Sequence, residues 1–250
     1  MVYFIGAGPG DPELITLKGY KLVGQADVVI YAGSLVNKDI LRNAKQEAEI
    51  HNSASMTLDE VLEVMKKAHS EGKMVARVHT GDPSIYGAIR EQMDALDEVG
   101  ISYEVVPGVS SFVAAAAALK KEFTLPAVTQ TVILTRLEGR TDVPEKEKLR
   151  ELAKHQASMS IFLSVGMMEN VVTELLESYP AETPIAVVYK ASWPDQKIVM
   201  GTLSNILEKV KEESITKTAQ IVVGDFLGNR YELSKLYDKS FSHEYRSAKE

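Results

Sequence analysis

The first residues that could do chemistry are the glycines and acids of Gly6-Ala-Gly-Pro-Gly-Asp-Pro12, which follow a short apolar run. A Gly-x-Gly directly after a strand is typical of dinucleotide-binding loops. Here Asp11 stands where the third glycine of that pattern should be, and Pro9 and Pro12 have no backbone N–H to offer a phosphate. The loop therefore disfavours a pyrophosphate ligand, and a tight turn without any ligand is the alternative interpretation.

A second loop of the same kind is Thr80-Gly-Asp-Pro-Ser-Ile-Tyr-Gly87, again between an apolar run and a helical pattern. Because the carboxyl ends of parallel strands meet at one edge of a sheet, both loops should lie where open α/β folds bind ligands. Asp82 has two interpretations that the sequence leaves open. It is either the N-cap of a helix whose first turn contains Pro83, or an acceptor for a cationic or hydroxyl-bearing ligand.

Nucleophiles and metal ligands are scarce elsewhere in the chain. Cysteine is absent, which excludes disulfides, thiolate zinc sites, iron–sulfur ligation and cysteine nucleophiles. The five histidines are scattered without metal-ligand spacing. His79 ends a strand beside the second loop, where it is either a structural histidine or a proton carrier. No catalytic residue and no metal site are predicted.

Short β-branched runs alternate with helical patterns through the first half of the chain. Such alternation predicts a mostly parallel sheet covered by helices, since parallel strands need crossover connections. The expected strands are Val2–Ile5, Asp27–Tyr31, Met74–His79 and Tyr103–Val106, and the expected helices are Glu13–Val23, Leu58–Ser70 and Tyr86–Val99.

The pattern changes after Val105-Val-Pro-Gly-Val-Ser-Ser111, and closely spaced late strands predict a mixed sheet in the second half. Its expected strands are Thr131–Thr135, Ser160–Ser164, Ile185–Tyr189, Lys197–Met200 and Ala219–Val223, with helices at Pro144–Lys154, Met167–Ser178 and Leu203–Glu212. The fold class is therefore α/β with two domains. We place them at residues 1–115 and 116–230, followed by a tail over 231–250.

Composition is that of an ordinary globular protein, with 45% hydrophobic and 25% charged residues. Lys and Arg number 28 against 35 Asp and Glu, a formal charge of −7 that disfavours non-specific nucleic-acid binding. No apolar run approaches the roughly 18–20 residues of a membrane span, and the N-terminus does not resemble a secretory signal. Together with the missing cysteines, this predicts a cytoplasmic protein without membrane contact.

The order and spacing of these motifs resemble those of the tetrapyrrole (corrin/porphyrin) methyltransferases. The resemblance begins with Gly6-Ala-Gly-Pro-Gly-Asp-Pro-Glu-Leu-Ile-Thr-Leu-Lys-Gly19, and the Gly-Asp-Pro loop and Val105–Ser111 follow in the family's order. Three later segments are similar to the branch that methylates C-11 of precorrin-4 or cobalt-precorrin-4. They are Thr129–Thr141, Val187–Asp195 and Ser234–His243.

The resemblance implies S-adenosylmethionine as methyl donor, bound in a cleft between two α/β domains of a homodimer. Carried over by position, the donor contacts are Pro9, Thr80, Gly81, Asp82, Ile85, Ser110, Ser111 and Ala191. Many relatives have a methionine after the aromatic residue of the strand that follows the linker. This chain has Phe162-Leu-Ser-Val-Gly166 there, so Ser164 departs from the pattern and is not included.

The acceptor implied is a corrinoid macrocycle with acetate and propionate carboxylates. In the family the first glycine loop faces the tetrapyrrole, which makes Asp11 a substrate-binding candidate. Arg136, Arg140 and Lys190 lie in the branch-like segments and are candidates for binding the carboxylates. For each cation the alternative is a solvated charge on a loop.

The expected activity is therefore donor-dependent methylation of C-11 of (cobalt-)precorrin-4, giving (cobalt-)precorrin-5 in cobalamin biosynthesis. Methyl transfer chiefly requires that donor and nucleophile be held in line, so no Ser/His/Asp arrangement is needed. The alternatives are another tetrapyrrole methyltransferase, acting on uroporphyrinogen III or precorrin-2/-3, a diphthine synthase, or a non-catalytic tetrapyrrole carrier. A dinucleotide-dependent oxidoreductase is already disfavoured by Asp11.

Overall fold

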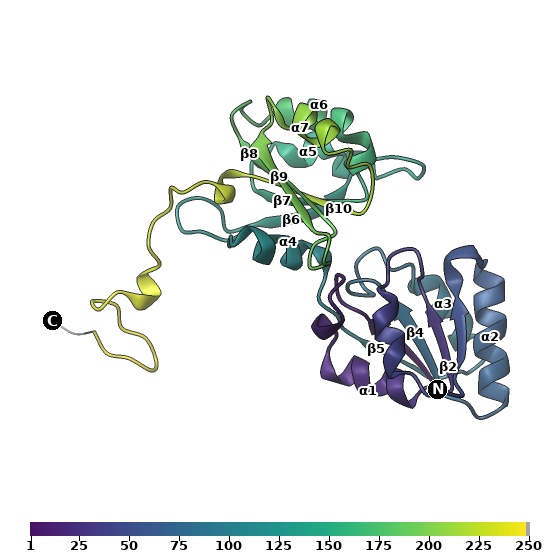
Figure 1. Ribbon diagram of the computed structural model, residues 1–250. Coiled ribbons are helices and arrows are strands. Elements are labelled where there is room, and N and C mark those ends of the chain that lie inside the picture. Colours follow the sequence, from purple (N-terminus) through teal and green to yellow (C-terminus); the bar gives the residue numbers. More distant parts are fainter. Residues whose placement is uncertain (249–250) are drawn as a thin grey trace. The chain divides into compact units, whose positions relative to one another are not determined.

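The computed structural model describes residues 1–248, and the chain folds into two compact units (Figure 1). The first unit consists of Met1–Ala114 together with Lys190–Gln196. The second consists of Ala115–Tyr189 and the chain from Lys197 onward. The domain limits expected from the sequence, 1–115 and 116–230, stay a prediction.

The first unit is built on a five-stranded sheet in which every pairing is parallel, as the alternating pattern predicts. Its strands run in the order β3-β2-β4-β1-β5. They are β1 (Val2–Gly6), β2 (Val28–Tyr31), β3 (Glu49–Asn52), β4 (Val75–His79) and β5 (Tyr103–Val106). The sequence did not predict β3, because its side chains are mostly exposed and show no apolar alternation.

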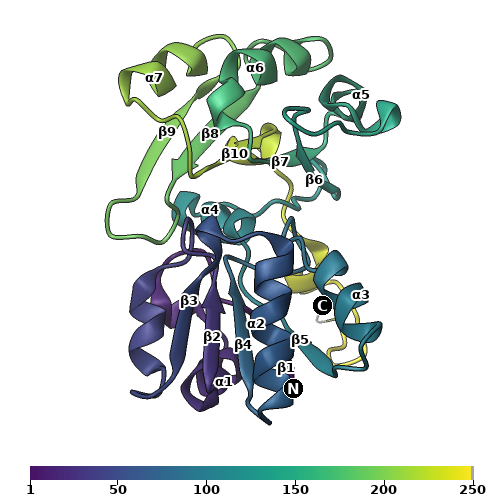
Figure 2. The ribbon, with the colours of Figure 1, turned by 90° about the vertical axis from the view of Figure 1, so that its right-hand side faces the viewer.

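Helices cover both faces of this sheet (Figure 2). Helices α2 (Leu58–Ser70) and α3 (Arg90–Asp97) pack on Phe4 and Ile30, while α1 (Leu17–Gln25) packs on the other face against Ile5 and Val29. Thr57 begins α2 with a capping box, in which its hydroxyl and the Glu60 carboxylate each accept from the other's backbone N–H. Full burial of the large apolar side chains on both faces stabilises the unit.

In the first unit, two expected helices begin later than the sequence predicts. The segment from Glu13 first makes a short 3₁₀ turn, Pro12–Leu14, and α1 starts only at Leu17. The helix expected from Tyr86 starts at Arg90, because Tyr86 and Ala88 have φ of 55° and 48°, in the left-handed region. Residues in that region cannot continue a right-handed helix.

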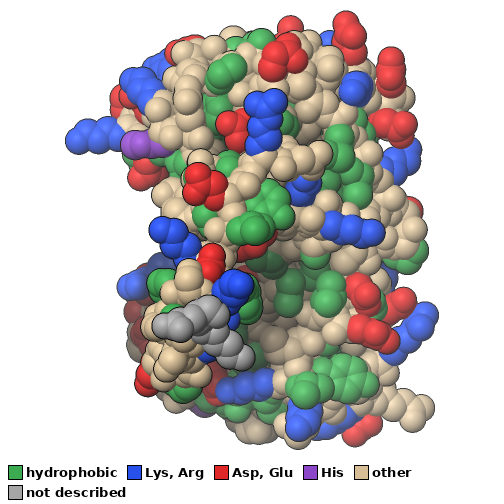
Figure 3. Space-filling model, turned by 90° about the vertical axis from the view of Figure 1, so that its left-hand side faces the viewer, with side chains coloured by type: hydrophobic (Ala, Val, Ile, Leu, Met, Phe, Trp, Pro, Cys, Tyr) green, Lys and Arg blue, Asp and Glu red, His purple; other side chains and the backbone are tan. Residues whose placement is uncertain are grey.

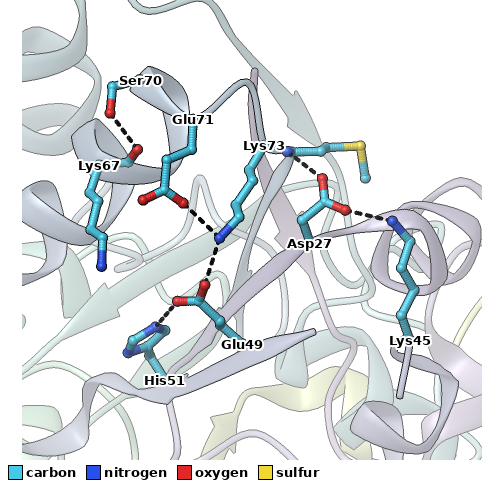
Figure 4. Close-up of polar contacts among 9 residues, drawn as sticks. Asp27, Lys45, Glu49, His51, Lys67, Ser70, Glu71 and Lys73 are labelled. Carbon is cyan, nitrogen blue, oxygen red and sulfur yellow. Dashed lines mark hydrogen bonds and ion pairs between the residues drawn. The ribbon is translucent and has the colours of Figure 1, made fainter. Parts of the chain in front are cut away.

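A network of ion pairs lies at the amino edge of the first sheet, opposite the glycine loops (Figure 4). Lys73 Nζ lies 2.7 Å from carboxylate oxygens of both Glu49 and Glu71. Asp27 accepts from Lys45 Nζ at 2.7 Å and from the backbone N–H of Met74 at 2.8 Å. These contacts join the first residues of β2 and β3 to the segment that enters β4.

The second unit has a mixed five-stranded sheet, as the sequence predicts. Its order is β6-β7-β10-β8-β9, with β6 and β7 parallel and the other neighbours antiparallel. The strands are β6 (Val132–Arg136), β7 (Ser158–Phe162), β8 (Pro184–Tyr189), β9 (Lys197–Thr202) and β10 (Ala219–Val223). Strand β7 begins and ends two residues earlier than expected.

Three helices pack on one face of this sheet through an apolar cluster that includes Ile161, Leu175 and Ile185. They are α5 (Leu149–Ala153), α6 (Met168–Leu176) and α7 (Ile206–Glu212). The helix expected over Pro144–Lys154 is interrupted at Lys148, whose ψ of 143° separates a 3₁₀ turn from α5. The alanine-rich segment forms α4 (Ser111–Leu119), in which Ala115 is fully buried.

Candidate functional site

The loops that follow β1 and β4 are joined by backbone hydrogen bonds at the carboxyl edge of the first sheet. The N–H of Ala7 donates to the carbonyl of His79 at 2.8 Å. Gly8 and Gly81 then form an isolated antiparallel bridge, with N···O distances of 3.3 and 2.8 Å. The two loops that the sequence singles out are therefore one connected surface.

Three glycines allow the loops after β1, β4 and β5 to approach one another without intervening side chains. A Cβ atom placed on Gly6 would lie 2.6 Å from both the Cα of Gly108 and the carbonyl oxygen of Gly81. One placed on Gly108 would lie 2.2 Å from the same oxygen. Gly81 also has a φ of +61°. Only backbone fits where the three loops meet, so backbone groups can come close to a ligand.

Asp82 holds two of these loops together through its carboxylate. Oδ1 accepts from the N–H of Ser84 at 2.8 Å and also from its hydroxyl, and Oδ2 accepts from the N–H of Gly108 at 2.8 Å. Partial burial raises the pKa of Asp82, but the hydrogen bonds from Ser84 and Gly108 outweigh it and leave this pKa below its usual value. Asp82 is therefore an ionised carboxylate at the carboxyl edge of the sheet.

The helix-cap interpretation of Asp82 is wrong, because α3 begins eight residues later, at Arg90. Asp82 instead closes a short turn, in which the N–H of Ile85 donates to its carbonyl oxygen at 3.2 Å. The interpretation as a ligand acceptor stays a prediction.

His79 and Arg77 are buried beneath the second loop, on the face of the sheet covered by α2 and α3. Burial, together with the charge of Arg77, lowers the pKa of His79 to about 3. The Nε2 atom of His79 has no hydrogen-bond partner among the described residues. Arg77 donates to Gln92 Oε1 at 3.1 Å and to Ser53 Oγ at 2.9 Å, and burial lowers its pKa to about 10. A neutral His79 whose Nε2 atom lacks a partner fits a structural role better than proton transfer.

The loop between β8 and β9, residues 190–196, contacts the first glycine loop. The N–H of Asp11 donates to Ser192 Oγ at 3.0 Å, while Asp11 Oδ1 accepts from the N–H of Glu13 at 2.9 Å. Lys190 Nζ lies 2.5 Å from Asp195 Oδ2. The structure thus brings Lys190 and Asp11, both predicted substrate ligands, into the same unit. Ser192 was missed by sequence reasoning, since nothing local marks a contact that spans 181 residues.

All the predicted donor contacts lie in the first unit, on the loops after β1, β4 and β5, at the first residue of α4 or on the 190–196 loop. Ser110 lies next to the second loop, because a Cβ on Gly81 would be 3.5 Å from its Cα. Ser110 and Ala191 are both 6% exposed. The predicted donor residues are Pro9, Thr80, Gly81, Asp82, Ile85, Ser110, Ser111 and Ala191.

Arg136 and Arg140, the other predicted substrate ligands, belong to the second unit. The guanidinium of Arg136 donates to the backbone carbonyls of Leu137, Thr141 and Asp142 at 3.3, 3.0 and 2.7 Å. It therefore organises the loop that carries Arg140, which is exposed. Ser164 is fully buried, and its hydroxyl donates to Phe162 O at 2.6 Å and accepts from Leu137 N at 2.8 Å. Those backbone contacts give Ser164 a structural role.

Over the described residues, 1–248, no group of three or more acidic, histidine or cysteine side chains could hold a metal ion. Within the same part of the chain, none of the helices has the length and apolarity needed to cross a membrane.

The chain is similar to known proteins over nearly its whole length. The sequence profile described as tetrapyrrole (corrin/porphyrin) methylases matches residues 1–207. A protein of Methanocaldococcus jannaschii named cobalt-precorrin-4 C(11)-methyltransferase is 62% identical over 249 residues, which is 99% of this chain and 96% of that protein.

Solved structures agree with the sequence comparison. The X-ray structure of a cobalamin biosynthetic enzyme, a cobalt-precorrin-4 methyltransferase, is 51% identical with a TM-score of 0.89, covering 91% of this chain and 96% of that one. A uroporphyrin-III C-methyltransferase of Thermus thermophilus, solved in complex with S-adenosylhomocysteine, is 27% identical with a TM-score of 0.76. That match covers 90% of this chain and 98% of the other.

Proposed function

The chain belongs to the tetrapyrrole (corrin/porphyrin) methylase family, and on that premise we propose that it methylates C-11 of precorrin-4 or cobalt-precorrin-4. The observation that carries the proposal is the 62% identity, over 99% of the chain, to a protein named cobalt-precorrin-4 C(11)-methyltransferase. The product is (cobalt-)precorrin-5, an intermediate of cobalamin biosynthesis. The chain is accordingly an S-adenosylmethionine-dependent C-methyltransferase.

The residues at the carboxyl edge of the first sheet fit S-adenosylmethionine better than a nucleotide phosphate. The loops after β1 and β4 contain Pro9, Asp11 and the ionised Asp82, which offer a phosphate neither a row of N–H donors nor a positive charge. The negative charge of these loops favours the sulfonium and ammonium groups of the donor. The close contacts at the glycines let backbone groups approach the ligand. When bound, the donor supplies an activated methyl group.

The donor contacts that we propose are those carried over from the family: Pro9, Thr80, Gly81, Asp82, Ile85, Ser110, Ser111 and Ala191. Two features of the chain support them. The loops that carry Thr80–Asp82 and Ser110 are held side by side by the Asp82–Gly108 hydrogen bond. The Pro9 carbonyl accepts from the Trp193 indole, which holds the first glycine loop in place, and the Pro9 ring is an apolar surface that the donor could contact.

The acceptor carboxylates require cations that the protein as a whole does not supply in excess. Net charge is −7, and Figure 3 shows basic side chains interspersed with acidic ones over one face. We propose that Arg140 and Lys190 bind carboxylates of the macrocycle, with Arg136 shaping the loop of Arg140. Asp11, on the first glycine loop, is proposed to contact the macrocycle itself. A homodimer and a cytoplasmic location remain predictions from the family resemblance and from the cysteine-free composition.

The activity is tested with methyl-labelled S-adenosylmethionine and a panel of acceptors. Uroporphyrinogen III, precorrin-2, precorrin-4 and cobalt-precorrin-4 are each incubated with the protein, and the label is located by NMR. Label at C-11 of either precorrin-4 species is the expected result. Transfer to uroporphyrinogen III or precorrin-2 alone would place the chain in another branch of the family. Donor binding without transfer to any acceptor would instead indicate a carrier.

A further inference from the structure

Trp193, the only tryptophan of the chain, packs directly on the first glycine loop. Its indole Nε1–H donates to the carbonyl oxygen of Pro9 at 3.0 Å. A Cβ atom on Gly10 would lie 2.0 Å from both Cδ1 and Nε1 of the indole. The glycine at position 10 is therefore explained by the tryptophan, which occupies the space of any side chain there.

The 190–196 loop holds the indole in place through a strained but well-bonded backbone. Lys190 and Ser192 have φ of 46° and 72°, in the left-handed region that side chains other than glycine rarely adopt. The N–H of Trp193 donates to Lys190 O at 3.0 Å, and that of Ser192 donates to Gln196 Oε1 at 2.8 Å. Strain of this kind persists where surrounding contacts enforce it, and it is concentrated at functional sites.

The same loop also fixes the residue that follows Gly10. The hydroxyl of Ser192 accepts from the backbone N–H of Asp11, and on the other side the amide of Asn37 donates to Gly10 O at 2.9 Å. Lys190 Nζ lies 5.4 Å from the centroid of the Trp193 ring and pairs with Asp195. Trp193 thus contacts both the glycine loop and the cation proposed to bind the acceptor.

We propose that Trp193 is a positioning residue, which holds the Pro9–Asp11 backbone and the Lys190 side chain in the geometry needed to bind the corrinoid acceptor. This inference rests on the proposed function. Trp193 acts through its contacts with Pro9 and Gly10 and through its ring face toward Lys190. The donor loop at Thr80–Asp82 is held by separate bonds, between Gly8 and Gly81 and between Asp82 and Gly108.

The first experiment compares Trp193→Phe and Trp193→Ala with the wild-type protein. Phenylalanine keeps a ring against Gly10 but loses the N–H bond to Pro9, so the acceptor KM should rise about two- to tenfold. The alanine variant should raise the acceptor KM further. The affinity for S-adenosylhomocysteine, measured by calorimetry, should fall less than the acceptor affinity in both variants, because six of the eight proposed donor contacts lie outside the first glycine loop and the 190–196 loop. The acceptor KM of Trp193→Phe should thus lie between those of the wild-type protein and Trp193→Ala.

A second arm tests the contact with Gly10 by size compensation. Gly10→Ala alone forces the indole away and should raise the acceptor KM, with a red shift of the single tryptophan's fluorescence. Adding Gly10→Ala to Trp193→Ala should raise the acceptor KM much less than it does in the wild-type protein, because the indole that clashes with the new Cβ is absent. Gly72→Ala is the control for general destabilisation: φ is +69° there and nothing lies within 4 Å, so Tm should fall by about 2–8 °C with the acceptor KM unchanged.

An unchanged acceptor KM in a folded Trp193→Ala protein would overturn the inference. So would equal losses of donor and acceptor affinity in the Trp193 variants together with a lower Tm, because general destabilisation would account for them. If the alanine variant does not fold, Trp193→Phe decides the question by the same two readouts. A wild-type protein that transfers no methyl group would refute the proposed function and this inference together, whereas an active wild type with insensitive variants refutes the inference alone.

Discussion

The carboxylate of Asp82 accepts a hydrogen bond from the backbone N–H of Gly108 at 2.8 Å, across 26 residues of sequence. Its other oxygen accepts from Ser84 within the same turn. One side chain thereby fixes the distance between the loop after β4 and the loop after β5. Joining the two loops requires both the charge and the geometry of the carboxylate, because its two oxygens accept from donors on different loops.

Asp82→Asn should weaken both this connection and donor binding. Asparagine has one carbonyl oxygen and an NH₂ group, so one of the two backbone N–H groups would face another donor. We expect a loss of about 1–3 kcal/mol in the free energy of unfolding. Loss of the charge should weaken the binding of S-adenosylhomocysteine about ten- to a hundredfold. Thermal denaturation and calorimetry on one variant measure the two effects.

Asp238→Asn is the matched control for this substitution. Asp238 makes the same turn, with Oδ1 accepting from the N–H of Ser240 at 2.8 Å and from its hydroxyl at 2.7 Å, while the more distant Arg246 donates to its backbone carbonyl, which the substitution keeps. Its asparagine variant should keep wild-type stability and donor affinity. Wild-type donor affinity in folded Asp82→Asn would leave Asp82 with a structural role only.

The sequence is sufficient to predict elements whose side chains follow a simple pattern. Strands such as β1 and β2 are continuous apolar runs, and Thr57 and Glu60 mark the start of α2. It fails where backbone conformation overrides pattern, as at Tyr86 and Ala88, whose apolar spacing suggests a helix that their φ values forbid.

The same distinction applies to the candidate site, whose residues could be predicted from the sequence while their contacts could not. Glycines and acids of the two loops are visible in the sequence because turn residues are concentrated there. Their contacts are not visible: Gly6 meets Gly108, and Trp193 reaches Pro9 across 184 residues. Such long-range packing is decided by the assembled fold, so Arg136 could be predicted as a cation but not as the organiser of its own loop.

His79 should make the stability of the protein depend on pH from about pH 6.5 downward, starting above the range in which carboxylates titrate. Its pKa is about 3 when folded and 6.5 ordinarily, so the unfolded chain gains a proton below pH 6.5 that the folded chain does not bind. Stability is therefore full above pH 6.5 and falls as the pH drops toward 3. Between pH 8 and pH 5 this contributes a loss of about 2 kcal/mol.

His79→Leu tests this dependence, because the Nε2 atom that it removes has no hydrogen-bond partner among the described residues. Urea denaturation at pH 8 and pH 5 should show a smaller pH effect in the variant than in wild type. His155 is exposed, and His155→Leu should keep the wild-type difference. An identical pH effect in His79→Leu would show that another group causes it.

Gly108→Ala should disrupt the junction of the three loops. The added Cβ would lie 2.2 Å from the carbonyl oxygen of Gly81 and 2.7 Å from the Cα of Gly6, and neither neighbour is a side chain that could rotate away. We expect a loss of more than about 3 kcal/mol in the free energy of unfolding, together with loss of donor binding. Gly72→Ala, with open space around it, should cost only about 1–2 kcal/mol. Equal denaturation midpoints for the two variants would contradict the close packing.

Arg136 and Arg140 should separate in their effects, although they lie four residues apart. The guanidinium of Arg136 donates to three backbone carbonyls, so Arg136→Ala should lower both the thermal stability of the protein and its acceptor affinity. Arg136→Lys should not restore either, because an ammonium lacks the planar set of donors that reaches all three oxygens.

Arg140 is exposed and available to a carboxylate, so Arg140→Ala should leave Tm unchanged while weakening acceptor binding about ten- to a hundredfold, the range of a charge-assisted hydrogen bond. Affinity for S-adenosylhomocysteine should be unchanged in both variants, since the proposed donor contacts belong to the other unit. Arg42→Ala, which removes an exposed arginine paired with Asp39, is the control for lost surface charge. Wild-type acceptor affinity in Arg140→Ala would reduce Arg140 to a solvated charge, and an unchanged Tm in Arg136→Ala would show that its three carbonyl contacts do not order the loop.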